Sequence, residues 1–215
     1  MSSFLDEVET SLPAGLHLPE ELRLAFRWME QNGFVRQGAT RYCGLYPAAV
    51  QQGLGTAYAH FTKVDTDLAG YWLGNHDASV TARLAPFIVT GADGSCAGLW
   101  LDDSGQQRFV HMGSGSGSTL ACVLANNAVD LLRFLAIGYE ETCWPDLFEL
   151  TPEDAYALQD LDDLYRPPVE FRHWVETSFG VKIPKTGSEI VGRVADIAED
   201  NSDDPFWQWA RKVAG

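Results

Sequence analysis

Residues 85–112, APFIVTGADGSCAGLWLDDSGQQRFVHM, contain three short apolar runs that are separated by two polar turns. Gly94 and Gly105 stand in these turns, where glycine readily adopts the positive φ that a tight hairpin requires. The side chains of Asp93 and Asp102 can accept hydrogen bonds from nearby backbone amides. The segment therefore predicts three adjacent antiparallel strands, and it gives the clearest β signal in the chain.

Helical periodicity appears on both sides of these strands. Residues 19–32 carry apolar side chains at helical spacing and end before Gly33, which predicts a helix with a glycine at its C-terminal end. Residues 127–137 repeat this pattern, and the side chain of Asn127 can cap the start of the helix. We expect this second helix to be buried against the sheet.

The remaining segments complete the fold prediction. Residues 34–82 have a mixed pattern, from which we expect loops, one short helix and one strand. Residues 141–215 contain three helical patterns, led by Phe171, by Val191 and by Pro205. We therefore expect an α+β fold with a helical C-terminal extension that packs on the same unit.

The charge balance limits the classes of partner. Thirty Asp and Glu residues face fifteen Lys and Arg residues, which gives a formal net charge of −15. Such a chain repels phosphate backbones, so we expect no nucleic-acid ligand. A basic protein partner suits the sign of the charge, although excess acid also serves solubility alone.

The sequence also predicts where the protein resides. Its N-terminus has no basic segment followed by an apolar run, and no stretch approaches the roughly 18 apolar residues that span a bilayer. The cysteines Cys43, Cys96, Cys122 and Cys143 are widely spaced and form no CxxC pair. We therefore expect a cytoplasmic protein without a membrane span, in which these cysteines are buried free thiols.

No motif in the chain carries recognisable chemistry. The glycine-serine stretch 113–118 matches neither a nucleophile elbow nor a phosphate-binding loop, and we expect it to be a flexible connection. The five histidines show no HExxH pattern and no metal-ligand spacing with a cysteine. We expect no metal, no cofactor and no catalytic residue, although acid-base pairs that folding assembles escape a motif search.

One segment is unusually acidic. Between Arg133 and Arg166 there is no Lys or Arg, but there are nine carboxylates, with Trp144 and Phe148 set among them. An aromatic anchor surrounded by one sign of charge is typical of a site that binds an oppositely charged protein. The predicted partner-binding residues are Glu140, Glu141, Trp144, Asp146, Phe148, Glu149, Glu153, Asp154 and Asp160. The alternative is a solvated acidic face with Trp144 in the core.

The order of predicted elements, an N-terminal helix, a short-stranded sheet and a following helix, resembles the SUKH superfamily, also called the Smi/Knr-like fold. The residues that carry the resemblance are Pro86-Phe87, Asp93-Gly94, Gly98-Leu99-Trp100-Leu101-Asp102 and the helix Val129–Leu135. The resemblance covers about residues 15–140. It implies a SUKH-like domain over 1–140, a helical extension over 141–215, and a concave sheet face that binds other proteins.

The resemblance also implies a class of function. Many bacterial members of this superfamily are immunity proteins, which neutralise polymorphic or contact-dependent toxins, and others are adaptors. We therefore expect a non-enzymatic immunity protein that binds a basic secreted toxin in the cytoplasm. An adaptor that docks on a cellular machine is the alternative, and an enzyme with an unrecognised site is a third reading. The oligomeric state is left open.

Overall fold

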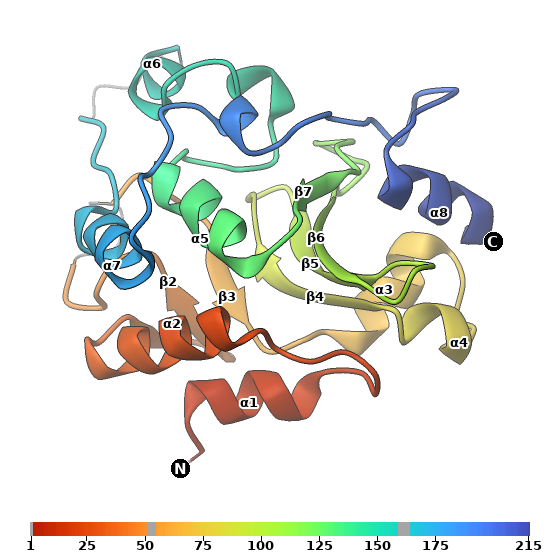
Figure 1. Ribbon diagram of the computed structural model, residues 1–215, viewed down its shortest axis with the longest axis horizontal. Coiled ribbons are helices and arrows are strands. Elements are labelled where there is room, and N and C mark those ends of the chain that lie inside the picture. The colour runs from red at the N-terminus through yellow and green to blue at the C-terminus, as the bar shows by residue number, and fades with distance from the viewer. Residues whose placement is uncertain (1, 51–54, 159–163) are drawn as a thin grey trace.

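The computed structural model describes residues 2–50, 55–158 and 164–215. Within them the chain forms a seven-stranded antiparallel sheet whose strands follow one another in sequence order (Figure 1). The strands are β1 (Val35–Gln37), β2 (Arg41–Gly44), β3 (His60–Thr62), β4 (Leu84–Val89), β5 (Cys96–Leu101), β6 (Gln107–Met112) and β7 (Val123–Ala125). No helix in the described residues is long and apolar enough to cross a membrane.

The helices lie on both sides of the sheet (Figure 1). They are α1 (Phe4–Ser11), α2 (Glu20–Gln31), α3 (Thr66–Leu73), α4 (Ala78–Thr81), α5 (Ala128–Ile137), α6 (Pro152–Ala157), α7 (Val169–Phe179) and α8 (Pro205–Val213). Two short 3-10 turns cover Pro145–Leu147 and Gly187–Glu189. The α+β fold class predicted from the sequence is confirmed.

The three strands predicted over residues 85–112 are confirmed as β4, β5 and β6, paired antiparallel. Both turn glycines have positive φ, +93° at Gly94 and +81° at Gly105. The Asp93 carboxylate accepts a hydrogen bond from the Ser95 amide, and Asp102 accepts from Gln106. The turn residues thus fold the hairpins as their chemistry predicts.

The two helices predicted beside the strands are also confirmed, as α2 and α5. The Asn127 side chain accepts a hydrogen bond of 2.8 Å from the Asp130 amide and so caps α5. Gly33, just beyond α2, has a φ of +77°. Leu131 and Leu135 of α5 are buried, as expected.

One face of the sheet is covered by α1, α2, α5 and α7. Phe26 of α2 packs edge-on against Phe61 of β3, with ring centroids 4.9 Å apart, and against Phe4 of α1 at 5.3 Å. Leu131 of α5 and Phe171 of α7 are fully buried in the same cluster. This cluster is the main hydrophobic core.

The second face is covered only in part. A smaller cluster joins Leu73 of α3 and Phe206 and Trp209 of α8 to Trp100 and Met112 of the sheet. The sheet residues that are buried in this cluster come from β4, β5 and β6. Figure 1 shows α3 and α8 beside strands β4 to β6, on the side of the molecule away from β2.

The register shows that β2 and β3 continue the same second face. His60 of β3 pairs with Val89, and Val89 pairs with Cys96, which belongs to the second cluster. Directly paired residues point to the same side of a sheet, so His60 lies on this face. Gly44 is the partner of His60 in β2, and Tyr42, two residues before Gly44 in the same strand, points to the same side. Here the face carries half-exposed polar side chains instead of a packed helix.

Two expectations for the connecting segments are wrong. The described part of residues 34–82 contains three strands, β1 to β3, and two helices, instead of one strand and one helix. Residues 191–198 form an extended connection instead of a helix, because the Ala121 amide donates to the Ala195 carbonyl and the Ile197 amide to the Thr119 carbonyl. Helices α1 and α6 were not predicted.

The C-terminal residues 164–215 lie against the rest of the chain. Trp174 of α7 stacks on Trp28 of α2, with ring centroids 4.9 Å apart. Phe206 and Trp209 of α8 are buried against the sheet. The division into a domain over 1–140 and an extension over 141–215 stays a prediction.

Candidate functional site

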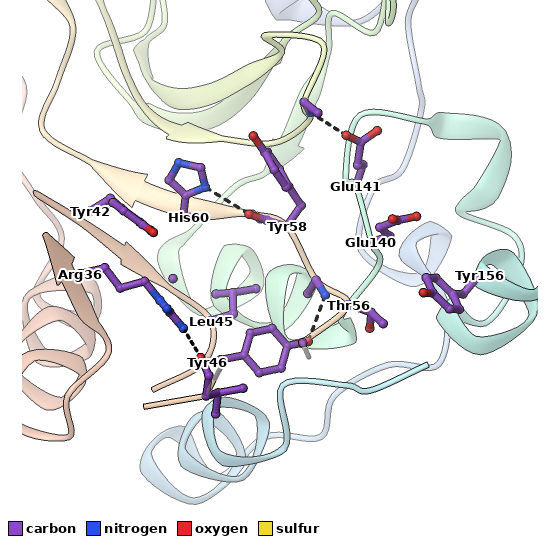
Figure 2. Close-up of a pocket in the computed structure, with 16 residues that line it drawn as sticks. Arg36, Tyr42, Leu45, Tyr46, Thr56, Tyr58, His60, Glu140, Glu141 and Tyr156 are labelled. Carbon is purple, nitrogen blue, oxygen red and sulfur yellow. Dashed lines mark hydrogen bonds between the residues drawn. The ribbon is translucent and has the colours of Figure 1, made fainter. Parts of the chain in front are cut away.

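A hollow of about 640 Å³ lies on the open half of the second sheet face (Figure 2). We call it the sheet pocket. Its polar and aromatic lining comprises Arg36, Tyr42, Tyr46, Thr56, Tyr58, His60, Glu140, Glu141 and Tyr156. Its size is in the range of cavities that bind small ligands or peptide segments.

The strands supply one wall of the sheet pocket. The ring of His60 lies edge-on to Tyr42 and to Tyr58, with centroids 5.1 and 5.6 Å apart. Its Nδ1 is 3.1 Å from the carbonyl oxygen of Tyr58, so this nitrogen carries the proton. Burial lowers the pKa of His60, although the hydrogen bond from Nδ1 acts in the opposite direction. His60 is therefore neutral near pH 7.

Arg36 lies at the other side of this wall. Its guanidinium donates hydrogen bonds to the carbonyl oxygens of Pro47, at 3.1 Å, and of Val50, at 3.0 Å. It makes no ion pair with any carboxylate of the described residues. The guanidinium therefore holds the loop after β2 in place.

The loop that follows α5 supplies the facing wall. The Glu140 carbonyl accepts a hydrogen bond of 2.7 Å from the Tyr58 amide. The Glu141 carboxylate accepts one bond from the Ala92 amide and one from Trp144 Nε1, each 2.6 Å long. In the described part of the chain, the Glu140 carboxylate has no hydrogen bond or ion pair. Glu141 is thus anchored, whereas the charge of Glu140 is uncompensated.

A second hollow, of about 290 Å³, lies next to the same loop. We call it the Trp144 groove. It is lined by Gly117, Ser118, Thr119, Leu120, Trp144, Pro145, Asp146, Val194, Ala195, Asp196 and Glu199. Trp144 is 36 % exposed and Val194 is 40 % exposed, which places two apolar side chains among three carboxylates. The Trp144 groove is thus an acidic groove with an aromatic wall.

The structure separates the predicted partner-binding residues into three groups. Glu140 and Glu141 line the sheet pocket, and Trp144 and Asp146 line the Trp144 groove. The exposed carboxylates of the third group lie on or beside α6 and comprise Glu149, Glu153 and Asp154. Asp160 lies outside the described residues.

Phe148 does not belong to the surface. Its ring packs edge-on against Phe134, with centroids 5.3 Å apart, and also contacts Tyr139. It is buried in the main core, so the prediction that it serves as an exposed anchor is wrong. Trp144, by contrast, is at the surface, which removes the alternative that it is a core residue.

The pattern of residues 34–82 predicts only one strand, so the pocket residues Arg36, Tyr42, Tyr58 and His60 were not predicted. A signal was present in residues 58–62, where polar and apolar side chains alternate with the period of a half-buried strand. A stretch of five residues is too short to distinguish a strand from a loop by its period alone.

The described residues contain no group of three or more His, Cys, Asp or Glu that is placed to hold a metal ion. All four cysteines are buried free thiols, as predicted, and burial raises the pKa of each of them. What the sheet pocket can do is bind a polar or cationic group between carboxylates and aromatic rings.

The chain was also compared with known proteins. No protein-family model, no curated protein and no solved structure matches it. The resemblance to the SUKH superfamily therefore stays a prediction.

Proposed function

We propose that the chain is a non-catalytic binding protein that neutralises a basic secreted toxin in the cytoplasm. The observation that carries this proposal is the placement of one loop, residues 140–146, between the sheet pocket and the Trp144 groove. Both hollows combine carboxylates with aromatic side chains. A continuous binding surface over both of them would suit a protein better than a small metabolite.

The charge of the chain supports a basic partner. A net charge of −15 attracts a cationic protein over a distance of about one Debye length, roughly 8–10 Å at physiological salt. Contact at short range then depends on desolvated groups such as Trp144, whose indole is held by Glu141. Charge would thus set the association rate and the aromatic contact the dissociation rate.

Co-expression tests the proposal. The chain would be produced together with a candidate basic toxin domain from a neighbouring gene, and growth of the host would be measured. We expect the wild type to restore growth and a double variant, Glu140→Lys with Trp144→Ala, to fail while remaining folded by circular dichroism.

The adaptor alternative predicts a different result. An adaptor would neither bind the neighbouring gene product in calorimetry nor protect the host. That outcome would overturn the immunity proposal and favour docking on a resident cellular machine.

A further inference from the structure

The lining of the sheet pocket includes a carboxylate without a partner among the described residues and an exposed tyrosine. The backbone of Glu140 is bonded to that of Tyr58, which fixes the two residues next to each other. Tyr58 is 42 % exposed, and the Glu140 carboxylate has no partner among the described residues. Figure 2 shows Glu140 and Glu141 on one side of the pocket and Arg36 across it.

The other charged groups of the pocket do not cancel this charge. Arg36 directs its guanidinium at two backbone carbonyls on the opposite side, and His60 is neutral near pH 7. The Glu141 carboxylate accepts hydrogen bonds from the Ala92 amide, from Trp144 Nε1 and from the Cys143 thiol, and it has no cationic partner among the described residues. The end of the pocket near Glu140 therefore favours a cation.

Aromatic rings add a second source of cation affinity. A Lys or Arg head group that lies over the face of a tyrosine is attracted by the ring quadrupole, by about 0.5–2 kcal/mol. Arg and Lys also donate charge-assisted hydrogen bonds to carboxylates. An open sheet face with these groups at its rim has room for the cation and for the backbone that carries it, in a volume of about 640 Å³.

We propose that the sheet pocket is a binding site for a cationic side chain, Lys or Arg, which the basic partner inserts beside the carboxylates of Glu140 and Glu141 and the tyrosine rings that line the pocket. The proposal rests on the proposed function, because it names the part of the partner that this pocket receives. The Trp144 groove remains a separate contact surface for the same partner, next to the sheet pocket.

The test uses four small probes and the full-length protein. The cationic probes are Nα-acetyl-arginine methylamide and Nα-acetyl-lysine methylamide. The citrulline analogue preserves the shape of arginine without its charge, and the glutamate analogue carries the opposite charge. Each would be titrated into ¹⁵N-labelled protein while backbone amide shifts are recorded.

We expect saturable shifts at Tyr58, His60 and Glu140 with a cationic probe, at a Kd of about 1–10 mM. The citrulline analogue should bind at least about tenfold more weakly, because it cannot form a charge-assisted bond. Saturation by only one of the two cationic probes would assign the site to that side chain.

Two matched variants locate the site. Glu140→Gln removes the uncompensated charge and leaves every side-chain hydrogen bond of the described residues intact, so it should fold normally and weaken the cationic probe about five- to tenfold. Glu153→Gln makes the same change on α6, outside the sheet pocket, and should leave the Kd unchanged.

Four results would overturn the assignment: no saturable shift with either cationic probe, equal affinity for the arginine and citrulline probes, tighter binding of the glutamate probe, or equal behaviour of the two variants. None of these measurements involves a toxin. Probe binding without protection of the host would therefore count against the proposed function alone, and protection without probe binding would count against the pocket assignment alone.

Discussion

A single carboxylate, that of Asp93, organises the segment beside the Trp144 groove. It accepts hydrogen bonds from the amide and hydroxyl of Ser95, from the Ser114 hydroxyl and from the Ser118 amide. These bonds join the turn between β4 and β5 to the glycine-serine stretch 113–118. The stretch is thus held by specific hydrogen bonds, in contrast to the flexible connection expected from its composition.

The titration of Asp93 should be visible in the stability of the protein. Burial alone would raise its pKa, but the hydrogen bonds from Ser118, Ser95 and Ser114 outweigh burial and lower the pKa from 3.8 to about 2. Since the folded-state pKa is the lower one, the charged form stabilises the fold above pH 3.8, and this contribution is lost as the pH falls toward 2.

Replacing this carboxylate should therefore remove part of the acid sensitivity. We expect Asp93→Asn to lower the free energy of unfolding at pH 7 by about 2 kcal/mol and to flatten its dependence on pH between about 4 and 2. Urea unfolding at several pH values measures both effects. The control is Asp103→Asn, an exposed residue in the turn between β5 and β6. If both variants kept the wild-type pH slope, the structural role of Asp93 would be refuted.

The aromatic residues Trp144 and Phe148 differ in burial, so their replacement should lower stability by different amounts. Phe148→Ala should cost about 3–5 kcal/mol of unfolding free energy, because it opens a cavity beside Phe134 and Tyr139. Trp144→Ala should cost only about 1 kcal/mol, since the indole is partly exposed and loses one bond to Glu141. Urea denaturation compares the two, and similar losses would contradict the assignment of Trp144 to the surface.

At the scale of elements, α8 is fastened to the sheet by the residue that caps it. The Asp204 carboxylate accepts hydrogen bonds from the Trp207 amide in the first turn of α8 and from the Val123 amide of β7, each 2.9 Å long. One side chain therefore begins the last helix and also satisfies the first amide of the last strand. The helix then buries Phe206 and Trp209 against Trp100.

We expect Asp204→Ala to destabilise the protein by about 2–3 kcal/mol, because it removes a helix cap and leaves the Val123 amide without its partner. Its neighbour Asp203 is exposed and pairs with Arg193 at the surface, so Asp203→Ala should change stability by less than about 0.5 kcal/mol. Thermal unfolding that follows tryptophan fluorescence measures the difference. Equal melting temperatures for the two variants would show that the cap does not hold α8.

The elements that could be predicted from the sequence are those whose local signals agree with their tertiary contacts. Strands β4 to β6 have turn glycines at each hairpin, and α5 has both a cap and an apolar stripe. The segment 191–198 has an apolar pattern of helical period but pairs with residues 119–121, a long-range contact that no local window reveals. In the candidate site, the loop with Glu140 and Trp144 was predicted from its charge. The wall formed by the sheet was not predicted, because its strands are too short to give a clear local pattern.

At the scale of the whole molecule, the two hollows and α6 carry exposed or half-exposed carboxylates that have no cationic partner among the described residues. Asp146, Glu149 and Glu153 are exposed, and none of them forms an ion pair with a described residue. Exposed charges of one sign produce a field that extends beyond contact distance and is screened by salt. This surface therefore suits long-range attraction of a basic partner, in addition to solubility.

The contribution of this field can be measured from association rates. Replacing Asp146, Glu149 and Glu153 with Lys should slow association with a basic toxin at least about tenfold at low salt, and the difference should shrink as salt rises. The dissociation rate should change little, because exposed rim charges contribute little once the complex has formed. Surface plasmon resonance at several salt concentrations gives both rates.

The matched control reverses the same number of charges elsewhere, at Asp67, Asp103 and Asp203, which lie by α3, the turn after β5 and α8. Both triple variants shift the net charge equally, so total charge alone would slow both to the same degree. A larger loss for the first variant assigns the steering to the surface around the loop 140–146, because only a local field distinguishes the two. Equal rates would mean that the acidity acts through net charge, and contact with the partner would then have to be located from the Trp144→Ala and Glu140→Gln variants alone.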